Sequence, residues 1–164
     1  MATANKNLSQ YEKGTIPNGA DFRIGIVVSE WNDDITSPLM NGAIEALREN
    51  GVKKKNIIVK NVPGTFELPL GCQFLLEADE DMDGVIAIGC VIQGETKHFD
   101  FVCQGATQGI MAVTMEYNTP VSFCVLTDNT KQQSIDRSGG KHGNKGIECA
   151  VSLLKMIGLQ EELD

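Results

Sequence analysis

The sequence predicts an α/β fold in which a four-stranded parallel sheet lies between two layers of helices. Short runs of β-branched residues alternate along the chain with longer stretches of helical period. These runs are almost continuously apolar, which is typical of parallel strands that are covered on both faces. Repeated β-α units require right-handed crossovers and helices on both sides of the sheet. We therefore expect a flavodoxin-like three-layer α/β/α sandwich, preceded by an N-terminal arm.

The predicted strands are four short runs rich in Val and Ile. They cover residues 23–29, 56–62, 83–92 and 120–126. Their lengths are typical of strands and too short for buried helices.

The helical stretches lie between and after these strands. In the first of them, Ser37 is expected to be the N-cap, Pro38 the first helical residue and Gly51 the terminator. The other helices are predicted over about 67–78, 97–117, 132–137 and 144–159.

Residues 1–22 have no helical period and are interrupted by Gly14, Pro17 and Gly19, so they are predicted to form an arm. Residues 23–164 then form a single α/β domain. The part of the arm before Gly14 has two interpretations that the sequence leaves open. Either it is disordered, or it adds a strand to the sheet edge of a neighbouring subunit.

Composition excludes several classes of protein. The net charge of −8 argues against a nucleic-acid partner. The longest apolar stretch, Gly84 to Ile92, is much shorter than the about 20 residues of a membrane-spanning helix. The first residues are polar and lack the apolar core of a secretory signal, so we expect a cytoplasmic protein. The 5 cysteines are scattered, which predicts buried thiols and neither disulfides nor a metal site.

Ligand-type residues follow each predicted strand, where ligands bind in open parallel sheets. The only tryptophan, Trp31, follows the first strand with Asn32, and Glu67 ends a Pro-Gly loop after the second. The third strand leads into Gly94-Glu95-Thr96 and His98. Aromatic, amide, carboxylate, hydroxyl and imidazole groups together indicate a site for a polar planar heterocycle with hydroxylated and anionic attachments.

Each of these residues also has a purely structural interpretation. Trp31 is equally well placed as an aromatic packed under a loop, and Glu67 as a carboxylate that stabilises a helix start. Thr96 fits an ordinary N-cap as well as a phosphate-binding hydroxyl. His98 is either a surface histidine or a general base, and a helix start favours the neutral imidazole that a base needs. Arg137 is a candidate anion ligand, although lone arginines are usually surface residues.

Several ordered motifs together resemble the 6,7-dimethyl-8-ribityllumazine synthase family from residue 23 to about 159. They are Trp31-Asn32, the segment 63–69 (PGTFELP), the segment 89–100 (GCVIQGETKHFD) and the segment 126–146 around Arg137. The resemblance implies an enzyme, a transferase of riboflavin biosynthesis. It would condense 5-amino-6-(D-ribitylamino)uracil with 3,4-dihydroxy-2-butanone 4-phosphate, releasing phosphate and water, without metal or organic cofactor.

The resemblance also implies roles for individual residues. His98 would carry protons, Trp31 would stack on the pyrimidine, and Glu95 would bind phosphate with its neighbours. Phe123, Arg137 and Lys145 would reach in from an adjacent chain. The complete set of implied substrate-binding residues is Trp31, Asn32, Gly64, Thr65, Phe66, Glu67, Val91, Ile92, Gly94, Glu95, Thr96, Phe123, Arg137 and Lys145.

Self-association into pentamers, and from them a 60-chain icosahedral shell, is a further implication of the resemblance. The short connection 139–146 lacks the insertion that pentamer-only members carry, which favours the shell. Trp31 stands where many relatives have Phe, so riboflavin is expected to bind measurably. The alternative functions are a non-catalytic flavin- or pteridine-binding protein and a purely shell-forming protein.

Overall fold

The computed structural model describes residues 7–163, and its long strands form one parallel sheet in the order β2-β1-β3-β4. The strands are β1 (Ile24–Ser29), β2 (Ile57–Val62), β3 (Gly84–Ile92) and β4 (Val121–Asp128). All three pairings between neighbours are parallel. The predicted four-stranded parallel sheet is therefore confirmed, with strand limits that differ from the prediction by one or two residues.

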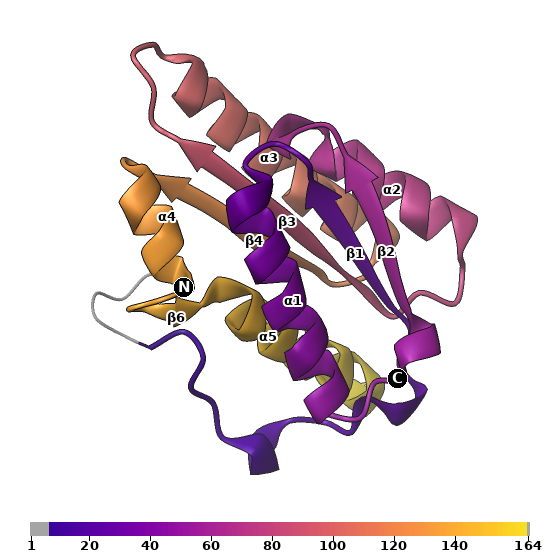
Figure 1. Ribbon diagram of the computed structural model, residues 1–164. Coiled ribbons are helices and arrows are strands. Elements are labelled where there is room, and N and C mark those ends of the chain that lie inside the picture. Colours follow the sequence, from indigo (N-terminus) through magenta and orange to yellow (C-terminus); the bar gives the residue numbers. More distant parts are fainter. Residues whose placement is uncertain (1–6, 164) are drawn as a thin grey trace.

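The helices cover the sheet on both sides, as Figure 1 shows. One face carries α1 (Asp33–Glu49) and α5 (Lys145–Leu163), and the other carries α2 (Leu68–Ala78) and α3 (His98–Tyr117). Alternate residues of β1 serve the two sides: Ile26 packs with the α1–α5 layer and Val27 with the α2–α3 layer. The three-layer flavodoxin-like sandwich is confirmed.

The expectation that every strand is covered on both faces is wrong for β2. This strand pairs only with β1 and lies at the edge of the sheet. Its Val59, Lys60 and Asn61 are exposed to solvent. A helix layer covers the centre of a sheet more completely than its edge, so an edge strand keeps polar and charged residues.

The predicted start of the first helix is also wrong. Helix α1 begins at Asp33, after Asn32 as its N-cap, and Pro38 lies inside the helix. Asp33 and Asp34 occupy the first turn, where carboxylates stabilise the positive helix end. Pro38 has no N–H to donate to the carbonyl of Asp34, so the helix lacks one hydrogen bond at this position. The Ser-Pro signal at residues 37–38 therefore did not mark the boundary.

A short hairpin lies between α4 (Lys131–Arg137) and α5. It pairs β5 (Ser138–Gly140) with β6 (Gly143–Asn144) in antiparallel fashion. Asn144 fastens it to α1, because its Nδ2 donates to the carbonyl of Pro38 at 2.9 Å. A Cβ at Gly146 would collide with the carbonyl oxygen of Leu39, so only glycine permits this approach of α5 to α1.

The described part of the arm, residues 7–22, packs on its own chain. It contains the 3₁₀ helices η1 (Lys13–Thr15) and η2 (Gly19–Asp21). Two further 3₁₀ helices lie outside the arm: η3 (Lys54–Asn56) before β2 and η4 (Thr65–Glu67) before α2. Leu8 N donates to the carbonyl of His142 (2.8 Å), and the Tyr11 hydroxyl donates to Glu49 (3.0 Å). No strand is present in residues 7–22. The prediction of disorder or strand exchange covered the whole segment before Gly14. Residues 7–13 of that segment form no strand and bond to their own chain, and residues 1–6 lie outside the described range.

None of the helices in residues 7–163 combines the length and the apolar character needed to cross a lipid bilayer.

Candidate active site

A cavity of about 620 Å³ opens beyond the carboxyl ends of β1 and β3, beside η4 and the first turns of α3. Because the strands are parallel, their carboxyl ends share one edge, and the loops after them meet there. The cavity is lined by Trp31, Asn32, Gly64, Thr65, Phe66, Glu67, Cys90, Val91, Ile92, Gly94, Thr96, His98, Phe99 and Val102. The sequence had identified residues of all these loops as ligand-type.

Trp31 stands at the rim of the cavity on a loop that the backbone holds in place. Its N–H donates to the carbonyl of Pro63 (3.2 Å), and the N–H of Glu30 donates to the carbonyl of Val62 (2.9 Å). The loop after β1 is thus joined to the loop after β2. The indole itself is 72% exposed, so the interpretation of Trp31 as an aromatic packed under a loop is wrong. An exposed ring on a fixed loop is a ready stacking surface.

Asn32 has a left-handed backbone conformation, with a φ of 61°. Asparagine tolerates this region better than most residues with a Cβ. Its side-chain Nδ2 donates to the carbonyl of Cys90 at 2.9 Å, which connects the loop after β1 to β3. The amide oxygen and the second N–H are not used by that bond.

The loop after β2 contributes η4 and a buried hydroxyl. Thr65 Oγ1 is buried and has no hydrogen-bond partner among the described residues. Glu67 closes the 3₁₀ turn, with its N–H donating to the carbonyl of Gly64 (3.3 Å), and its side chain is exposed. The loop therefore presents the Glu67 carboxylate at the cavity, whereas the Thr65 hydroxyl is buried against Gly89 of β3.

The loop from β3 to α3 projects beyond the carboxyl edge of the sheet (Figure 1) and is exposed throughout. The N-cap of α3 is Lys97, so the interpretation of Thr96 as the N-cap is wrong. The Thr96 hydroxyl accepts a hydrogen bond from the N–H of His98 (3.3 Å). A Cβ added to Gly94 would meet no atom within 4 Å, so the backbone there is open to a ligand. His98 is the first residue of α3 and is exposed.

Comparison with known proteins agrees with these motifs. The model of the family described as 6,7-dimethyl-8-ribityllumazine synthase matches residues 21–161. The chain belongs to the 6,7-dimethyl-8-ribityllumazine synthase family. It is accordingly a lumazine synthase, a transferase of riboflavin biosynthesis.

Curated lumazine synthases match almost the whole chain. That of Flavobacterium johnsoniae is 60% identical over 162 residues, which cover 99% of this chain and 85% of the relative. That of Christiangramia forsetii is 58% identical, with 99% of this chain and 96% of the relative covered. That of Porphyromonas gingivalis is 56% identical over 160 residues, covering 98% and 99%.

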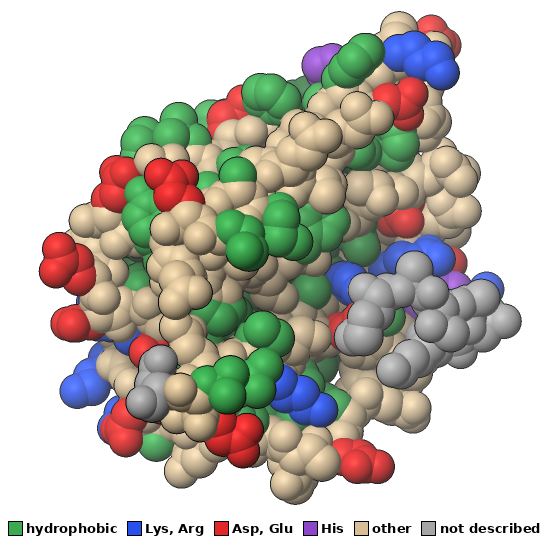
Figure 2. Space-filling view, turned by 180° about the vertical axis from the view of Figure 1, so that it is seen from behind, with side chains coloured by type: hydrophobic (Ala, Val, Ile, Leu, Met, Phe, Trp, Pro, Cys, Tyr) green, Lys and Arg blue, Asp and Glu red, His purple; other side chains and the backbone are tan. Residues whose placement is uncertain are grey.

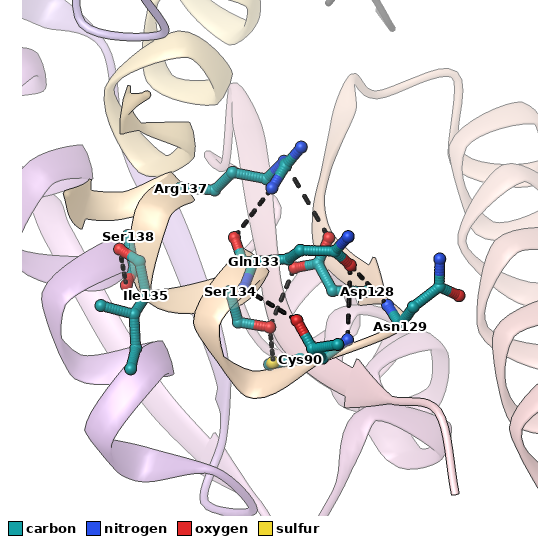
Figure 3. Close-up of polar contacts among 9 residues, drawn as sticks. Cys90, Asp128, Asn129, Gln133, Ser134, Ile135, Arg137 and Ser138 are labelled. Carbon is teal, nitrogen blue, oxygen red and sulfur yellow. Dashed lines mark hydrogen bonds and ion pairs between the residues drawn. The ribbon is translucent and has the colours of Figure 1, made fainter. Parts of the chain in front are cut away.

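Four predicted site residues of this lumazine synthase do not line the cavity of its own chain. Glu95 lies in the exposed loop beside it, and Phe123 is half-buried on β4. Lys145 forms an ion pair with Glu148 (Nζ to Oε1, 2.9 Å) at the start of α5. Arg137 ends α4 and interacts with Asp128 (Figure 3). The contribution of Phe123, Arg137 and Lys145 to an adjacent subunit stays a prediction.

Three lining residues of the lumazine synthase cavity were missed: Cys90, Phe99 and Val102. The helical spacing of Val102, four residues after His98, was the available signal for one of them. Nothing in the sequence distinguished Cys90 from the other cysteines, which also lie in apolar stretches. Burial raises the pKa of the Cys90 thiol to about 11, so it stays neutral near pH 7 and is not a nucleophile.

Within residues 7–163 no group of three His, Cys, Asp or Glu side chains is arranged to hold a metal ion. All 5 cysteines are free thiols.

Proposed function

We propose that this cavity brings 5-amino-6-(D-ribitylamino)uracil and 3,4-dihydroxy-2-butanone 4-phosphate together and condenses them to 6,7-dimethyl-8-ribityllumazine, phosphate and water. The observation that carries the proposal is the meeting of Trp31, Glu67 and His98 around one cavity, although they come from three separate loops. Trp31 supplies a stacking surface, Glu67 accepts hydrogen bonds from substrate hydroxyls, and His98 carries protons.

The uracil substrate stacks on the indole of Trp31, whose exposure and fixed loop support this role. Its ribityl hydroxyls bind Glu67 and the free part of the Asn32 amide. Main-chain groups of Thr65 and Phe66, and of Val91 and Ile92, hold the ring and the chain.

The phosphate of the second substrate binds at the loop before α3. Gly94 and Glu95 offer main-chain N–H groups, and Thr96 adds a hydroxyl. The open space at Gly94 and the positive end of a long helix support this assignment. The side chain of Glu95 makes the loop less positive, so the main-chain donors and an arginine from an adjacent subunit provide the attraction.

His98 transfers the protons of the reaction. The 5-amino group attacks the ketone and water leaves, giving an imine. Loss of a proton from carbon then expels phosphate and leaves an enol, which takes up a proton on carbon to become a ketone. The ribitylamine attacks this ketone and closes the ring with loss of water. Each step moves a proton, and one imidazole within reach of both substrates suffices. Holding the substrates in register supplies much of the remaining acceleration.

The active site is completed by self-association into pentamers, with the 60-chain shell as the final assembly. Exposed apolar residues gather on the outer side of the α2–α3 layer: Leu70, Phe74, Phe101, Met111 and Met115, here called the α2–α3 face. Figure 2, which views the molecule from behind, shows hydrophobic patches on this side. Apolar surface of this kind favours a protein partner, and a second copy of the chain would cover it. The adjacent subunit supplies Phe123, Arg137 and Lys145.

The free thiols support a reducing compartment, so we place the enzyme in the cytoplasm. We also take residues 23–164 as one domain carrying the arm 1–22.

The decisive experiment mixes both substrates with the pure protein and follows the fluorescence of the lumazine product. Product formation above the uncatalysed rate is expected, and it should saturate with each substrate. A protein that binds lumazine or riboflavin but leaves the rate at the uncatalysed value would instead be a binding protein.

A further inference from the structure

A chain of polar contacts runs from the cavity wall to Arg137, as Figure 3 shows. The Cys90 thiol donates to Ser134 Oγ (3.4 Å), and the Ser134 hydroxyl donates to Asp128 Oδ2 (2.9 Å). The other carboxylate oxygen, Asp128 Oδ1, lies 3.9 Å from Nε of Arg137. Cys90 itself lines the cavity, and its carbonyl accepts the bond from Asn32.

The carboxylate of Asp128 is held in one orientation. Ser134 is fully buried, and its hydroxyl both accepts from Cys90 and donates to Asp128. The Asp128 side chain is only 11% exposed, at the end of β4. A carboxylate so nearly buried needs polar partners. Asp128 has two: the Ser134 hydroxyl, which donates a hydrogen bond, and the Arg137 guanidinium, which carries the opposite charge.

The guanidinium of Arg137 is fixed but not saturated. Its Nη1 donates to the carbonyl of Gln133 (2.9 Å), and its side chain stays 36% exposed. A guanidinium has five N–H donors, and the other N–H groups of Arg137 make no hydrogen bond among the described residues. The guanidinium therefore keeps donors that an anion could use.

We propose that Asp128, oriented by Ser134, is a positioning residue that presents the Arg137 guanidinium to the phosphate of the butanone substrate. This inference rests on the proposed function, in which Arg137 serves the site of an adjacent subunit. The network begins beneath the cavity of one chain and ends at the group that this chain gives to its neighbour.

A carboxylate beside an arginine can also act in the opposite sense, by competing with the phosphate. The geometry favours positioning. At 3.9 Å, the Asp128 oxygen is beyond hydrogen-bond distance of Nε and takes none of its donors. Attraction between the opposite charges nevertheless restrains a side chain that otherwise has many rotamers. The phosphate then meets an arginine that has already lost much of its conformational freedom.

The test is steady-state kinetics of Asp128→Asn in the full-length assembled protein. The substitution keeps the shape and the contact with Ser134 but removes the charge. We expect KM for the butanone phosphate to rise about tenfold, as removal of a preorganising contact does, while KM for the uracil and kcat stay within about twofold. Inorganic phosphate should inhibit more weakly by the same factor. Asp128→Glu, which keeps the charge, should recover part of the loss.

A matched control is available at the other end of the sheet. Arg23 and Asp79 form an ion pair of similar exposure, 37% and 18%, with Nη2 to Oδ2 at 2.6 Å. Asp79→Asn should leave both KM values unchanged. Light scattering of each variant checks that the assembly has its normal size.

An unchanged or lower KM for the butanone phosphate in Asp128→Asn overturns the inference, and so does a parallel rise in both KM values. If Asp128→Asn does not fold, Ser134→Ala replaces it, because it releases the carboxylate without changing the charge. It should raise the same KM by a smaller factor, and no change would again overturn the inference. Arg137→Ala distinguishes failure of the proposed function from failure of this inference. If Arg137→Ala leaves KM for the butanone phosphate unchanged, the proposed role of Arg137 is wrong. If Arg137→Ala raises this KM but Asp128→Asn does not, only the positioning role of Asp128 is wrong.

Discussion

The side-chain amide of Asn32 donates to the main-chain carbonyl of Cys90 at 2.9 Å, across the edge where β1 and β3 end. Asn32 is at the same time the N-cap of α1 and adopts a left-handed backbone conformation. One residue thus sets the start of a helix, the spacing of two loops and part of the cavity wall. Its structural and ligand-binding roles can be separated by substitution.

Asn32→Ala should lower the free energy of unfolding by about 2 kcal/mol, about 1 from the lost hydrogen bond and about 1 from forcing Ala into the left-handed region. Asn32→Gly loses the same hydrogen bond, but glycine adopts the left-handed conformation without strain. It should therefore lower the free energy of unfolding by only about 1 kcal/mol. Urea unfolding at one fixed protein concentration measures both. Equal losses would mean that the left-handed conformation is not retained in the variants.

His98→Ala should reduce kcat by about 10²-fold, the low end of the range for general acid–base catalysis. The reduction is incomplete because an electron-rich amine reacts slowly with a ketone unaided. Fluorescence of the lumazine product measures the rate. His142, the other histidine, lies in the hairpin and does not line the cavity, so His142→Ala is the matched control. Wild-type rates in His98→Ala would contradict the role of the imidazole.

Met115→Glu should reduce the size of the assembly. Met115 is 74% exposed in the α2–α3 face, and a carboxylate there would be buried without a partner if another subunit covers the face. Light scattering should report smaller particles, with a loss of activity because each site lacks its neighbour's residues. Met115→Leu keeps the apolar surface and should assemble normally. Full-size particles in Met115→Glu would place the subunit contact elsewhere.

The stability of the fold should fall in alkali because of Cys72. Burial raises the pKa of this thiol to about 12, whereas in the unfolded chain the thiol ionises near its ordinary pKa of 9.0. The unfolded state therefore releases the proton first, and stability present below pH 9 is lost as the pH rises toward 12, at about 1.4 kcal/mol per pH unit.

Cys72→Val removes this titration and nearly keeps the volume. Between pH 9 and 11, its unfolding free energy should improve relative to wild type by about 1.4 kcal/mol per pH unit. Leu76→Val, a buried substitution in the same helix, should differ from wild type by an amount that does not change with pH. A pH-independent difference for Cys72→Val would show that the thiol ionises as readily in the folded protein as in the unfolded chain.

Much of the site could be predicted because the positions of the strands along the chain, and the residue types in the loops after them, can be recognised from short stretches of sequence. The β-branched runs identify β1 and β3, and in a parallel sheet their carboxyl ends must share an edge. Trp31, Glu67 and His98 were therefore expected near one another, and they line one cavity. The predicted start of α1 at Ser37 failed because the turn after β1 lets the helix begin at once, with aspartates already in its first turn.

The alternation of strands and helices follows from the amino-acid order, because the hydrophobic period depends on residues that are close together along the chain. Which polar groups meet depends instead on the folded arrangement of the whole chain. The bond from Asn32 to Cys90, the exposure of Trp31 and the carboxylate beside Arg137 each depend on how elements distant along the chain pack together. Local pattern carries no information on such contacts, because the distance between two side chains is set by the backbone of the whole fold.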